Sequence, residues 1–371
     1  MPALAAACSQ DRAFTPPNTV PPRTYPVDLP TPAPSFQRGI NLGNRLDAPN
    51  EGDWGPVLEE SDFPFIAARG FDHVRLPVRF SAHASAEYPY AVDADFILRV
   101  DWAIEQALSA GLSVVLDLHH YEELFTDPAA HQSRLIGIWE QLADHYVGFP
   151  SALAFEVVNE PQQNLDAQRY DALLDIVLPR IRALHPDRLI VIDSPDLGYA
   201  LSLPDLEPRM DPNLVVAVHI YTPTLFTFQG STVAGSGYDT TGILFPGPPA
   251  VPIEPAPEAS TEDWARDWIA EYNSLPAEEN PSGPAALNPL FEAMDAFMAS
   301  TSVPIYLGEW GAGDGADPES RAHYTRAIRR AAESRGIGWC IWEDGNAYTL
   351  FDSERGEWTT PVVDALFDDV P

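Results

Sequence analysis

The sequence predicts an α/β protein of the (β/α)8 TIM barrel class, with a long insertion after the sixth strand. Short apolar segments alternate with longer segments of helical period, and strands covered on both faces are apolar throughout. Polar residues also gather at the C-terminal ends of these segments, where such barrels carry their active sites. The eight apolar segments are residues 36–44, 73–78, 113–120, 152–160, 188–194, 213–221, 303–310 and 338–344.

The intervening segments support the barrel prediction. In residues 94–111 and 168–185, apolar residues recur every three or four positions, and Gly111 stands where a helix C-cap is expected. The alternative is a doubly wound open sheet, which would carry a glycine-rich phosphate-binding turn after its first strand. The segment "GINLGN" at residues 39–44 has neither the spacing nor the following helix for that role.

The predicted domain organisation has two parts. Residues 1–35 include "TPPNTVPPRTYPVDLPTPAPS" and form a proline-rich tether, while residues 36–371 form one catalytic domain. Within that domain, residues 222–287 are rich in Pro, Gly, Ser and Glu and interrupt the strand–helix rhythm. An insertion of this length is typically a functional loop or partly disordered.

The charge restricts the partners. The chain has 21 basic residues, all arginine, against 55 acidic residues, giving a net charge of −34. Such a surface repels nucleic acid and anionic membranes, so neither is an expected partner. It is compatible with a neutral polysaccharide. It also fits either adaptation to concentrated salt, where the carboxylates stay hydrated and screened, or acidic drift of a GC-rich genome.

The two cysteines have different surroundings. Cys340 lies in an apolar strand segment and is interpreted as a buried small hydrophobe. Cys8 ends "LAAAC", which resembles the cleavage box of a bacterial lipoprotein, and the N-terminal segment is interpreted as a possible remnant of an export signal. No run of apolar residues reaches the roughly 18 needed for a membrane helix. We therefore expect an extracellular or cell-surface protein.

Seven of the eight apolar segments end in polar or aromatic residues of a kind common in active sites. Any one of them could be a helix cap or a core residue, but parallel strands of a barrel bring these ends to one rim. Together they predict an active site at that rim. The residues are Asn41 and Asn44, Arg75, His119 and His120, Asn159 and Glu160, His219 and Tyr221, Glu309 and Trp310, and Trp342 and Glu343.

The two glutamates predict the chemistry. Glu160 and Glu309 end the fourth and seventh segments, so they face each other across the barrel mouth. Such a pair can divide the work of glycoside hydrolysis between a protonated general acid and an ionised nucleophile. Arg75 would keep one carboxylate ionised and Tyr221 could donate a hydrogen bond to it.

The neighbouring residue types favour a sugar ligand. Asn159 could bind a sugar hydroxyl beside the reacting carbon, and Trp342 offers a flat apolar face for a pyranose ring. A metal site is disfavoured because His119 and His120, as neighbours on one strand, should point to opposite faces. A serine hydrolase is disfavoured because the G-x-S-x-G motif is missing. We expect no metal and no cofactor.

The ordered blocks "GINLGN", "VRLPV", "LDLHH", "EVVNEP", "HIYTP", "YLGEWG" and "CIWEDGNAYTLFD" closely resemble glycoside hydrolase family 5, over about residues 36–352. The segment "FTFQGS" resembles the "FTHQGA" of an endoglucanase-containing branch, with Phe228 in place of its histidine. The resemblance implies a retaining (β/α)8 enzyme in which Glu160 is the acid/base and Glu309 the nucleophile.

The same resemblance implies the rest of the site. The residues that would complete the family's catalytic cleft are Arg75, His119, Asn159, His219, Tyr221 and Trp342. His120 matches the family less firmly, and the further candidate sugar contacts are Asn44, Trp54 and Trp310.

The expected activity is a cofactor-free endo-β-1,4-glucanase acting by double displacement on a β-linked polysaccharide or oligosaccharide. The same barrel and residues also serve β-mannanases, xyloglucanases and β-1,3-glucanases, because the loops determine the substrate. A non-catalytic carbohydrate-binding descendant is the remaining alternative. We expect a monomer.

Overall fold

The computed structural model describes residues 34–231, 234–343, 347–352 and 356–368. The predicted tether and Cys8 therefore lie almost wholly outside the described residues. The main feature is a closed barrel of eight parallel strands, paired in chain order with β8 returning to β1. The strands are β1 (Arg38–Asn41), β2 (His73–Val78), β3 (Ser113–Leu118), β4 (Leu153–Glu156), β5 (Ile190–Asp193), β6 (Leu214–Ile220), β7 (Ile305–Trp310) and β8 (Gly338–Ile341).

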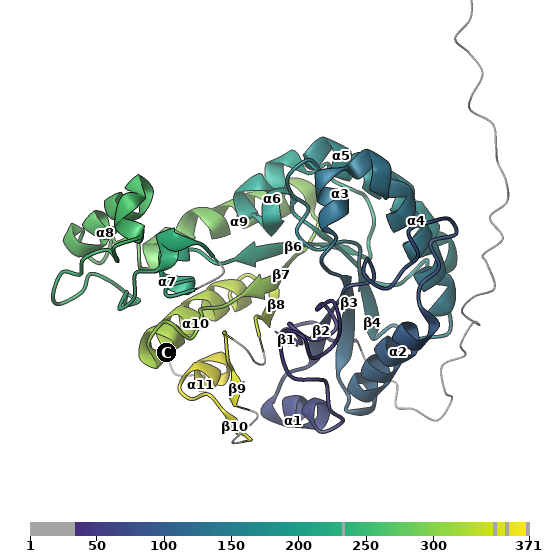
Figure 1. Cartoon of the computed structure of the whole chain (residues 1–371), viewed down its shortest axis with the longest axis horizontal. Helices are drawn as coiled ribbons and strands as arrows, with labels where there is room; N and C mark the ends of the chain where they lie inside the picture. The colour runs from purple at the N-terminus through teal and green to yellow at the C-terminus, as the bar shows by residue number, and fades with distance from the viewer. Residues whose placement is uncertain (1–33, 232–233, 344–346, 353–355, 369–371) are drawn as a thin grey trace, which may run out of the picture.

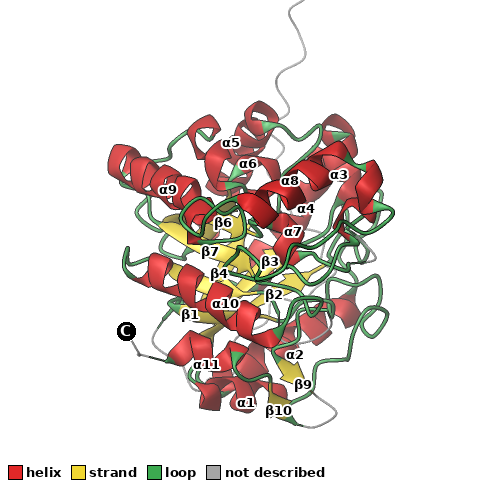
Figure 2. Ribbon diagram, turned by 90° about the vertical axis from the view of Figure 1, so that its left-hand side faces the viewer, coloured by secondary structure: helices red, strands yellow, loops and turns green. Residues whose placement is uncertain are grey.

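The barrel confirms the predicted fold class, and the open-sheet alternative is wrong. Helices cover the outside of the barrel (Figures 1 and 2). The main ones are α1 (Asp62–Arg69), α2 (Ala94–Ser109), α4 (Pro128–His145), α5 (Ala167–Leu184), α9 (Asn288–Thr301) and α10 (Pro318–Glu333). The remaining helices are α3 (Glu122–Thr126), α6 (Pro195–Gly198), α7 (Thr224–Thr227), α8 (Asp263–Ser274) and α11 (Val362–Phe367). A hairpin pairs β9 (Phe351–Asp352) with β10 (Glu357–Trp358).

Side-chain alternation separates two apolar layers. Outward-facing strand residues join the helices in a large core, as Val114 and Leu116 of β3 do. Inward-facing residues form a smaller core inside the barrel, which consists of Val115, Ala154, Val191, Val215, Ala217, Tyr306 and Cys340. Cys340 is fully buried, which confirms the interpretation of this residue as a small hydrophobe, and burial raises the pKa of its thiol.

A β-bulge interrupts the alternation in β7. Val218 of β6 pairs with Leu307, but the next residue, His219, pairs with Glu309, so Gly308 is the extra residue. A bulge of this kind re-aims the side chains that follow it. Tyr306 points into the barrel, and strict alternation would turn Glu309 outward; the bulge turns it inward instead. A Cβ at Gly308 would lie 2.9 Å from Nε2 of His219, so a larger residue would collide with that ring.

The insertion at 222–287 is packed in its described part. It contains α7, α8 and three 3-10 turns, at Ser236–Tyr238, Ala259–Thr261 and Pro284–Leu287. Figure 1 shows α8 at the periphery of the molecule, beyond α10. Buried Gln229 ties the segment together, because its side chain donates to the carbonyls of Phe226 and Ile243 and accepts the N–H of Ile243.

Among the described residues, we find no helix that is both long and apolar enough to cross a membrane.

Candidate active site

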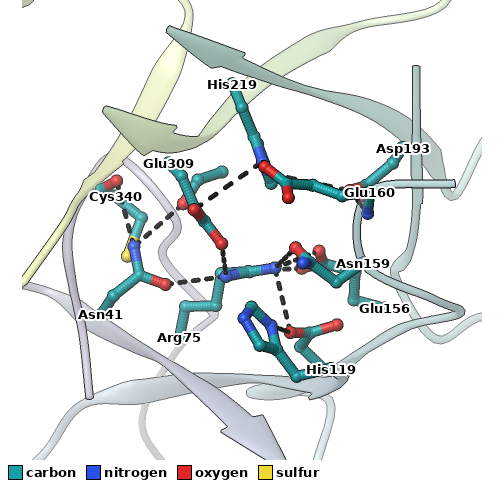
Figure 3. Close-up of polar contacts among 12 residues, drawn as sticks. Asn41, Arg75, His119, Glu156, Asn159, Glu160, Asp193, His219, Glu309 and Cys340 are labelled. Carbon is teal, nitrogen blue, oxygen red and sulfur yellow. Dashed lines mark hydrogen bonds and ion pairs between the residues drawn. The ribbon is translucent and has the colours of Figure 1, made fainter. Parts of the chain in front are cut away.

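Most of the predicted site residues meet at the C-terminal end of the barrel. Figure 3 shows six of them together, namely Arg75, His119, Asn159, Glu160, His219 and Glu309. Glu309 lies on β7 itself, whereas β4 ends at Glu156, so Asn159 and Glu160 lie in the loop that follows. Glu160 has a left-handed backbone conformation, with φ of 48°, which is unusual for a residue with a side chain. The N–H of Glu160 donates to Oδ2 of Asp193 at 2.8 Å.

The two predicted glutamates are close neighbours. One carboxylate oxygen of Glu160, one of Glu309 and a ring nitrogen of His219 all lie within 4.8 Å of one another. Retaining glycosidases hold their carboxyl groups about 5–5.5 Å apart, while inverting enzymes leave about 6.5–9.5 Å for a water. The short oxygen–oxygen spacing is compatible with the retaining class.

Arg75 is the centre of the site's polar network. Its guanidinium is fully buried and donates to both carboxylate oxygens of Glu156, at 2.8 and 2.6 Å. It also donates to Oε1 of Glu309 at 2.8 Å and to the amide oxygens of Asn41 and Asn159, at 2.9 and 2.8 Å. Because each side of the planar guanidinium is engaged, Arg75 fixes Glu309 and Asn159 relative to each other.

The surroundings of Glu309 favour its ionised form. Burial by itself would raise the pKa of Glu309, but the positive charges of His219 and Arg75 outweigh that effect. The Tyr221 hydroxyl adds a hydrogen bond to Oε2 at 2.9 Å. The net result is a pKa below the ordinary glutamate value, which suits a nucleophile.

The surroundings of Glu160 favour its protonated form. Burial raises the pKa of Glu160, and the negative charge of Glu309 raises it further against the opposing effect of His219. His219 lies 2.9 Å from Oε1 of Glu160 through Nδ1. Burial disfavours a charge on His219, but Glu309, Glu160 and Asp193 together raise the pKa of His219 to about 9. The pair therefore separates into one acid and one base.

His119 and Trp342 form one wall of the site. Their rings are stacked, with centroids 5.8 Å apart and planes 10° from parallel. Nδ1 of His119 lies 2.5 Å from Oδ2 of Asp117, which fixes the ring. Burial, together with the charges of His120 and Arg75, lowers the pKa of His119 well below its ordinary value, which favours the neutral ring. A neutral imidazole beside an indole can contact sugar hydroxyls and a sugar face.

The sequence-based argument about His119 and His120 is wrong. Strand β3 ends at Leu118, so strand alternation does not govern these residues, and their ring centroids are 4.5 Å apart on the same rim. Nε2 of His120 lies 3.8 Å from Oδ2 of Asp47, and His119 has a ring nitrogen within 4.8 Å of both groups. This arrangement removes the stated reason against a metal at this position.

Two of the further candidates for sugar contact lie at the mouth of the site. Asn44 donates to Oε2 of Glu343 at 2.6 Å and has a left-handed φ of 58°. Trp54 is 38% exposed and stands edge-on to His120, with centroids 5.3 Å apart. The Trp54 ring is therefore accessible to a ligand that reaches His120.

Trp310, the third further candidate, is not a sugar contact. It is completely buried and packs edge-on against Trp339, with ring centroids 5.5 Å apart, in the core between barrel and helices. The cause is the bulge at Gly308, which turns Glu309 inward and therefore turns the next residue outward.

Four acidic residues of the site were not selected from the sequence. Asp117, Glu156 and Asp193 point into the barrel beneath Arg75 and His219, and Asp47 lies beside His120. The first three interrupt otherwise apolar strands, in "VVLDL", "LAFE" and "IVID". An acidic residue in a buried strand must find a partner, and this signal could have identified them.

A (β/α)8 barrel with two neighbouring carboxyl groups whose pKa values are shifted in opposite directions, surrounded by amide, imidazole and indole side chains, defines a glycoside hydrolase. The family model "Cellulase (glycosyl hydrolase family 5)" matches residues 36–347. The chain belongs to this family, as the resemblance of its sequence blocks predicted.

Characterised relatives agree with that assignment. Endoglucanase H of Acetivibrio thermocellus is 26% identical over 361 residues, which are 95% of this chain but 35% of the relative. Endoglucanase C of the same organism is 27% identical over 90% of this chain and 98% of the relative. The structure of Cel5A from Thermotoga maritima with cellobiose is 34% identical, covers 89% of this chain and 97% of its own, and has a TM-score of 0.77.

Proposed function

We propose that the protein is a retaining endo-β-1,4-glucanase. The observation that carries this proposal is the pair Glu160 and Glu309, whose oxygens lie within 4.8 Å and whose pKa values are displaced in opposite directions. Names of relatives support the substrate. The chain spans only 35% and 39% of the length of two of them, so the activity of a longer protein is not transferred.

The proposed mechanism has two displacements. In the first, an oxygen of Glu309 attacks the anomeric carbon and the bond to the leaving oxygen breaks, while Glu160 gives its proton to that oxygen. In the second, the Glu160 carboxylate takes a proton from water, the water oxygen attacks the anomeric carbon, and Glu309 leaves as a carboxylate. At the end of the cycle Glu160 has regained its proton and Glu309 is again a free carboxylate, so no cofactor is required.

The other residues of the network hold these two groups in place. Arg75 and Tyr221 orient the two oxygens of Glu309, and Arg75 also holds the amide oxygen of Asn159, leaving the Asn159 NH2 group available to a sugar hydroxyl. Trp342, whose ring stacks with that of His119, presents its indole to the sugar. Positioning of this kind supplies much of the rate enhancement in enzymes.

A β-mannan is the second candidate substrate. The T. maritima Cel5A structures include one with cellobiose and one with mannotriose, both 34% identical to this chain. The neighbour described as a xyloglucan-specific enzyme is only 22% identical and supports the fold alone.

The proposal is tested with purified full-length chain on soluble β-1,4-glucan, β-mannan, xyloglucan and β-1,3-glucan. We expect reducing ends from the β-1,4-glucan and an early fall in viscosity, which marks internal cleavage. The first anomer released should be β, as seen by NMR. An α-anomer would contradict retention, and binding without reducing ends would indicate a carbohydrate-binding protein.

Glu309→Gln is the matched variant for this assay. The amide keeps the size of the side chain and can still accept hydrogen bonds, but it cannot act as the nucleophile. We expect a loss of at least about 10³-fold in turnover with a nearly unchanged melting temperature, because removing a nucleophile costs several kcal/mol of transition-state stabilisation. A large fall in melting temperature would make Glu309 a structural residue.

We further propose that the protein acts outside the cytoplasm, at the cell surface or in the medium. A polymeric substrate and the net charge of −34 support this location. Cell fractionation of the native producer, with metabolic labelling by a fatty acid, tests it. Labelling that depends on Cys8 would support a lipid anchor, and a wholly cytoplasmic, unlabelled protein would contradict the proposal.

A further inference from the structure

Asp193 is a buried acid next to the site for which the mechanism above has no role. It is the last residue of β5 and is completely buried. Its Oδ2 accepts the backbone N–H of Glu160 at 2.8 Å and also lies 3.7 Å from Nε2 of His219. Figure 3 shows Asp193 behind Glu160, on the side away from Arg75. The carboxyl group of Asp193 therefore contacts both the backbone of Glu160 and His219, which holds the Glu160 side chain.

The backbone contact provides a hydrogen-bond acceptor for the N–H of Glu160. Glu160 lies beyond the end of β4, and its left-handed conformation, with φ of 48°, takes its N–H out of the strand ladder. A buried N–H requires an acceptor, and Asp193 supplies it. The neighbouring residues of this turn have backbone partners of their own: the N–H of Asn159 donates to the carbonyl of Leu118 at 3.0 Å, and the carbonyl of Pro161 accepts the N–H of Leu197 at 3.2 Å.

The contact with His219 acts on the side chain of Glu160. Nδ1 of His219 lies 2.9 Å from Oε1 of Glu160, and Nε2 is buried without a hydrogen-bond partner among the described residues. Gly198 and Gly308 pack close against the ring, since a Cβ added at either position would lie 2.9 Å from a ring atom of His219. Asp193 therefore presents a carboxyl oxygen to the ring nitrogen of His219 that Glu160 does not contact, at 3.7 Å.

Charged groups from several strands surround Asp193. Burial raises the pKa of Asp193 well above its ordinary value, and the charge of Glu156 on β4 raises it further. The charges of His219 on β6 and Arg75 on β2 act in the opposite direction. On the helix side, the N–H of Asp193 donates to the hydroxyl of Tyr170, on α5, at 3.1 Å. A buried acid in such a place is costly, which argues for a function.

We propose that Asp193 is a positioning residue for the acid/base Glu160, which it holds through the Glu160 backbone N–H and through His219. This inference rests on the proposed glycosidase function. It assigns to Asp193 the orientation of the proton donor toward the leaving oxygen. It predicts that loss of Asp193 impairs the proton transfer and leaves the nucleophile intact.

The test compares two leaving groups on Asp193→Ala. Cellotetraose needs a proton on its leaving oxygen, whereas 2,4-dinitrophenyl β-cellobioside releases a phenolate that needs none. We expect kcat/KM to fall about 10- to 100-fold on cellotetraose, within the contribution of a general acid. On the dinitrophenyl substrate we expect a change in kcat/KM of less than about 3-fold, and azide should restore kcat because it attacks the glycosyl-enzyme without a base.

Asp193→Asn keeps the inference testable if the alanine variant does not fold. The amide retains an oxygen that can accept the Glu160 N–H but cannot form an ion pair with His219. We expect a smaller loss on cellotetraose with the same preference for the dinitrophenyl substrate. Equal losses on both substrates in every folded Asp193 variant would overturn the inference.

Tyr170→Phe is the matched control. It removes the acceptor of the Asp193 N–H and so disturbs the same residue of β5, but it leaves the Asp193 carboxylate in place. We expect a lower melting temperature and an unchanged ratio between the two substrates. A wild-type chain that cleaves neither substrate would refute the proposed function itself. An active wild type with an unchanged ratio in the variants would refute only the role of Asp193.

Discussion

Two chemically identical side chains acquire opposite roles at the residue scale. Glu309 lies against the cations Arg75 and His219, whereas Glu160 is partly buried next to the negative charge of Glu309 and contacts only His219 among these cations. The pKa of the first is lowered and that of the second is raised. The two pKa values differ because Glu309 contacts the Arg75 guanidinium and Glu160 does not. In the proposed cycle this difference allows Glu160 to donate a proton in the first step and to accept one in the second.

The first prediction concerns the pH profile. We expect a bell-shaped dependence of kcat/KM, with an acid limb where Glu309 becomes protonated and an alkaline limb where Glu160 loses its proton. His219 is the largest influence that lowers the pKa of Glu309, so His219→Gln should move the acid limb to higher pH. Profiles of both proteins on the dinitrophenyl cellobioside measure this. An acid limb that stays in place would contradict the assignment of Glu309.

The second prediction concerns stability at Asp47. Burial raises the pKa of Asp47 from 3.8 to about 6. Since the folded state binds this proton more tightly than the unfolded state, stability is lost as the pH rises from 3.8 to about 6, and the full cost applies above that value. A displacement of about two pKa units lowers the free energy of unfolding by at most roughly 3 kcal/mol.

Asp47→Asn removes that cost and keeps an acceptor for the N–H of Arg45. We expect a higher free energy of unfolding at pH 8, by about 1–3 kcal/mol, and no gain near pH 4. Denaturant unfolding at the two pH values measures it. Asp267→Asn, at an exposed position of α8, is the control for a general change in charge. A gain of equal size at both pH values would show that Asp47 acts through packing.

At the scale of elements, the positions of a few backbone irregularities determine the site. The bulge at Gly308 turns Glu309 into the barrel, and the turn after β4 presents Glu160. Asn41 helps to hold the bulge, because its amide donates to the carbonyl of Gly308 at 3.0 Å. Irregularities of this kind commonly lie next to active sites.

The third prediction concerns the insertion at 222–287. Gln229→Leu keeps the size of a buried side chain but removes three hydrogen bonds to the backbone of Phe226 and Ile243. We expect faster hydrogen exchange and proteolysis within the insertion, corresponding to about 1–3 kcal/mol for buried backbone groups left unpaired. Exchange of the barrel strands should be unchanged; faster exchange throughout would mean that the insertion is part of the global folding unit.

At the scale of the whole molecule, the net charge of −34 is the dominant property. Self-repulsion among so many carboxylates destabilises the compact state, and salt screens it. The described arginines are largely paired with acids, for example in the pair between Arg326 and Asp368 at 2.6 Å, so most of the excess is unpaired acid.

The fourth prediction follows from that excess. Raising NaCl from about 0.1 to 1 M shortens the screening length from about 10 to 3 Å, so we expect a higher melting temperature and undiminished turnover of a neutral glucan. Calorimetry and reducing-end assays across the salt series measure both. A protein that is most stable and most active at low salt would show that the acidic composition is not an adaptation to salt.

The barrel, the strand order and most residues of the rim could be predicted from the amino-acid pattern alone. Eight apolar segments can bury both faces of eight strands in few ways, and parallel strands bring their C-terminal ends together. Glu160, Glu309, Arg75 and His219 could therefore be selected without coordinates. These selections depended only on strand ends, which local pattern predicts well.

The directions in which particular side chains point depend on the folded barrel and could not be predicted. Trp310 and Glu309 exchanged faces because of a bulge that is defined by the pairing of β7 with β6, and His119 and His120 came together because β3 ends before them. The place of Asp193 behind Glu160 likewise depends on residues 33 positions apart. Register and long-range contact are set by the closure of the whole barrel, so no local window of sequence contains them.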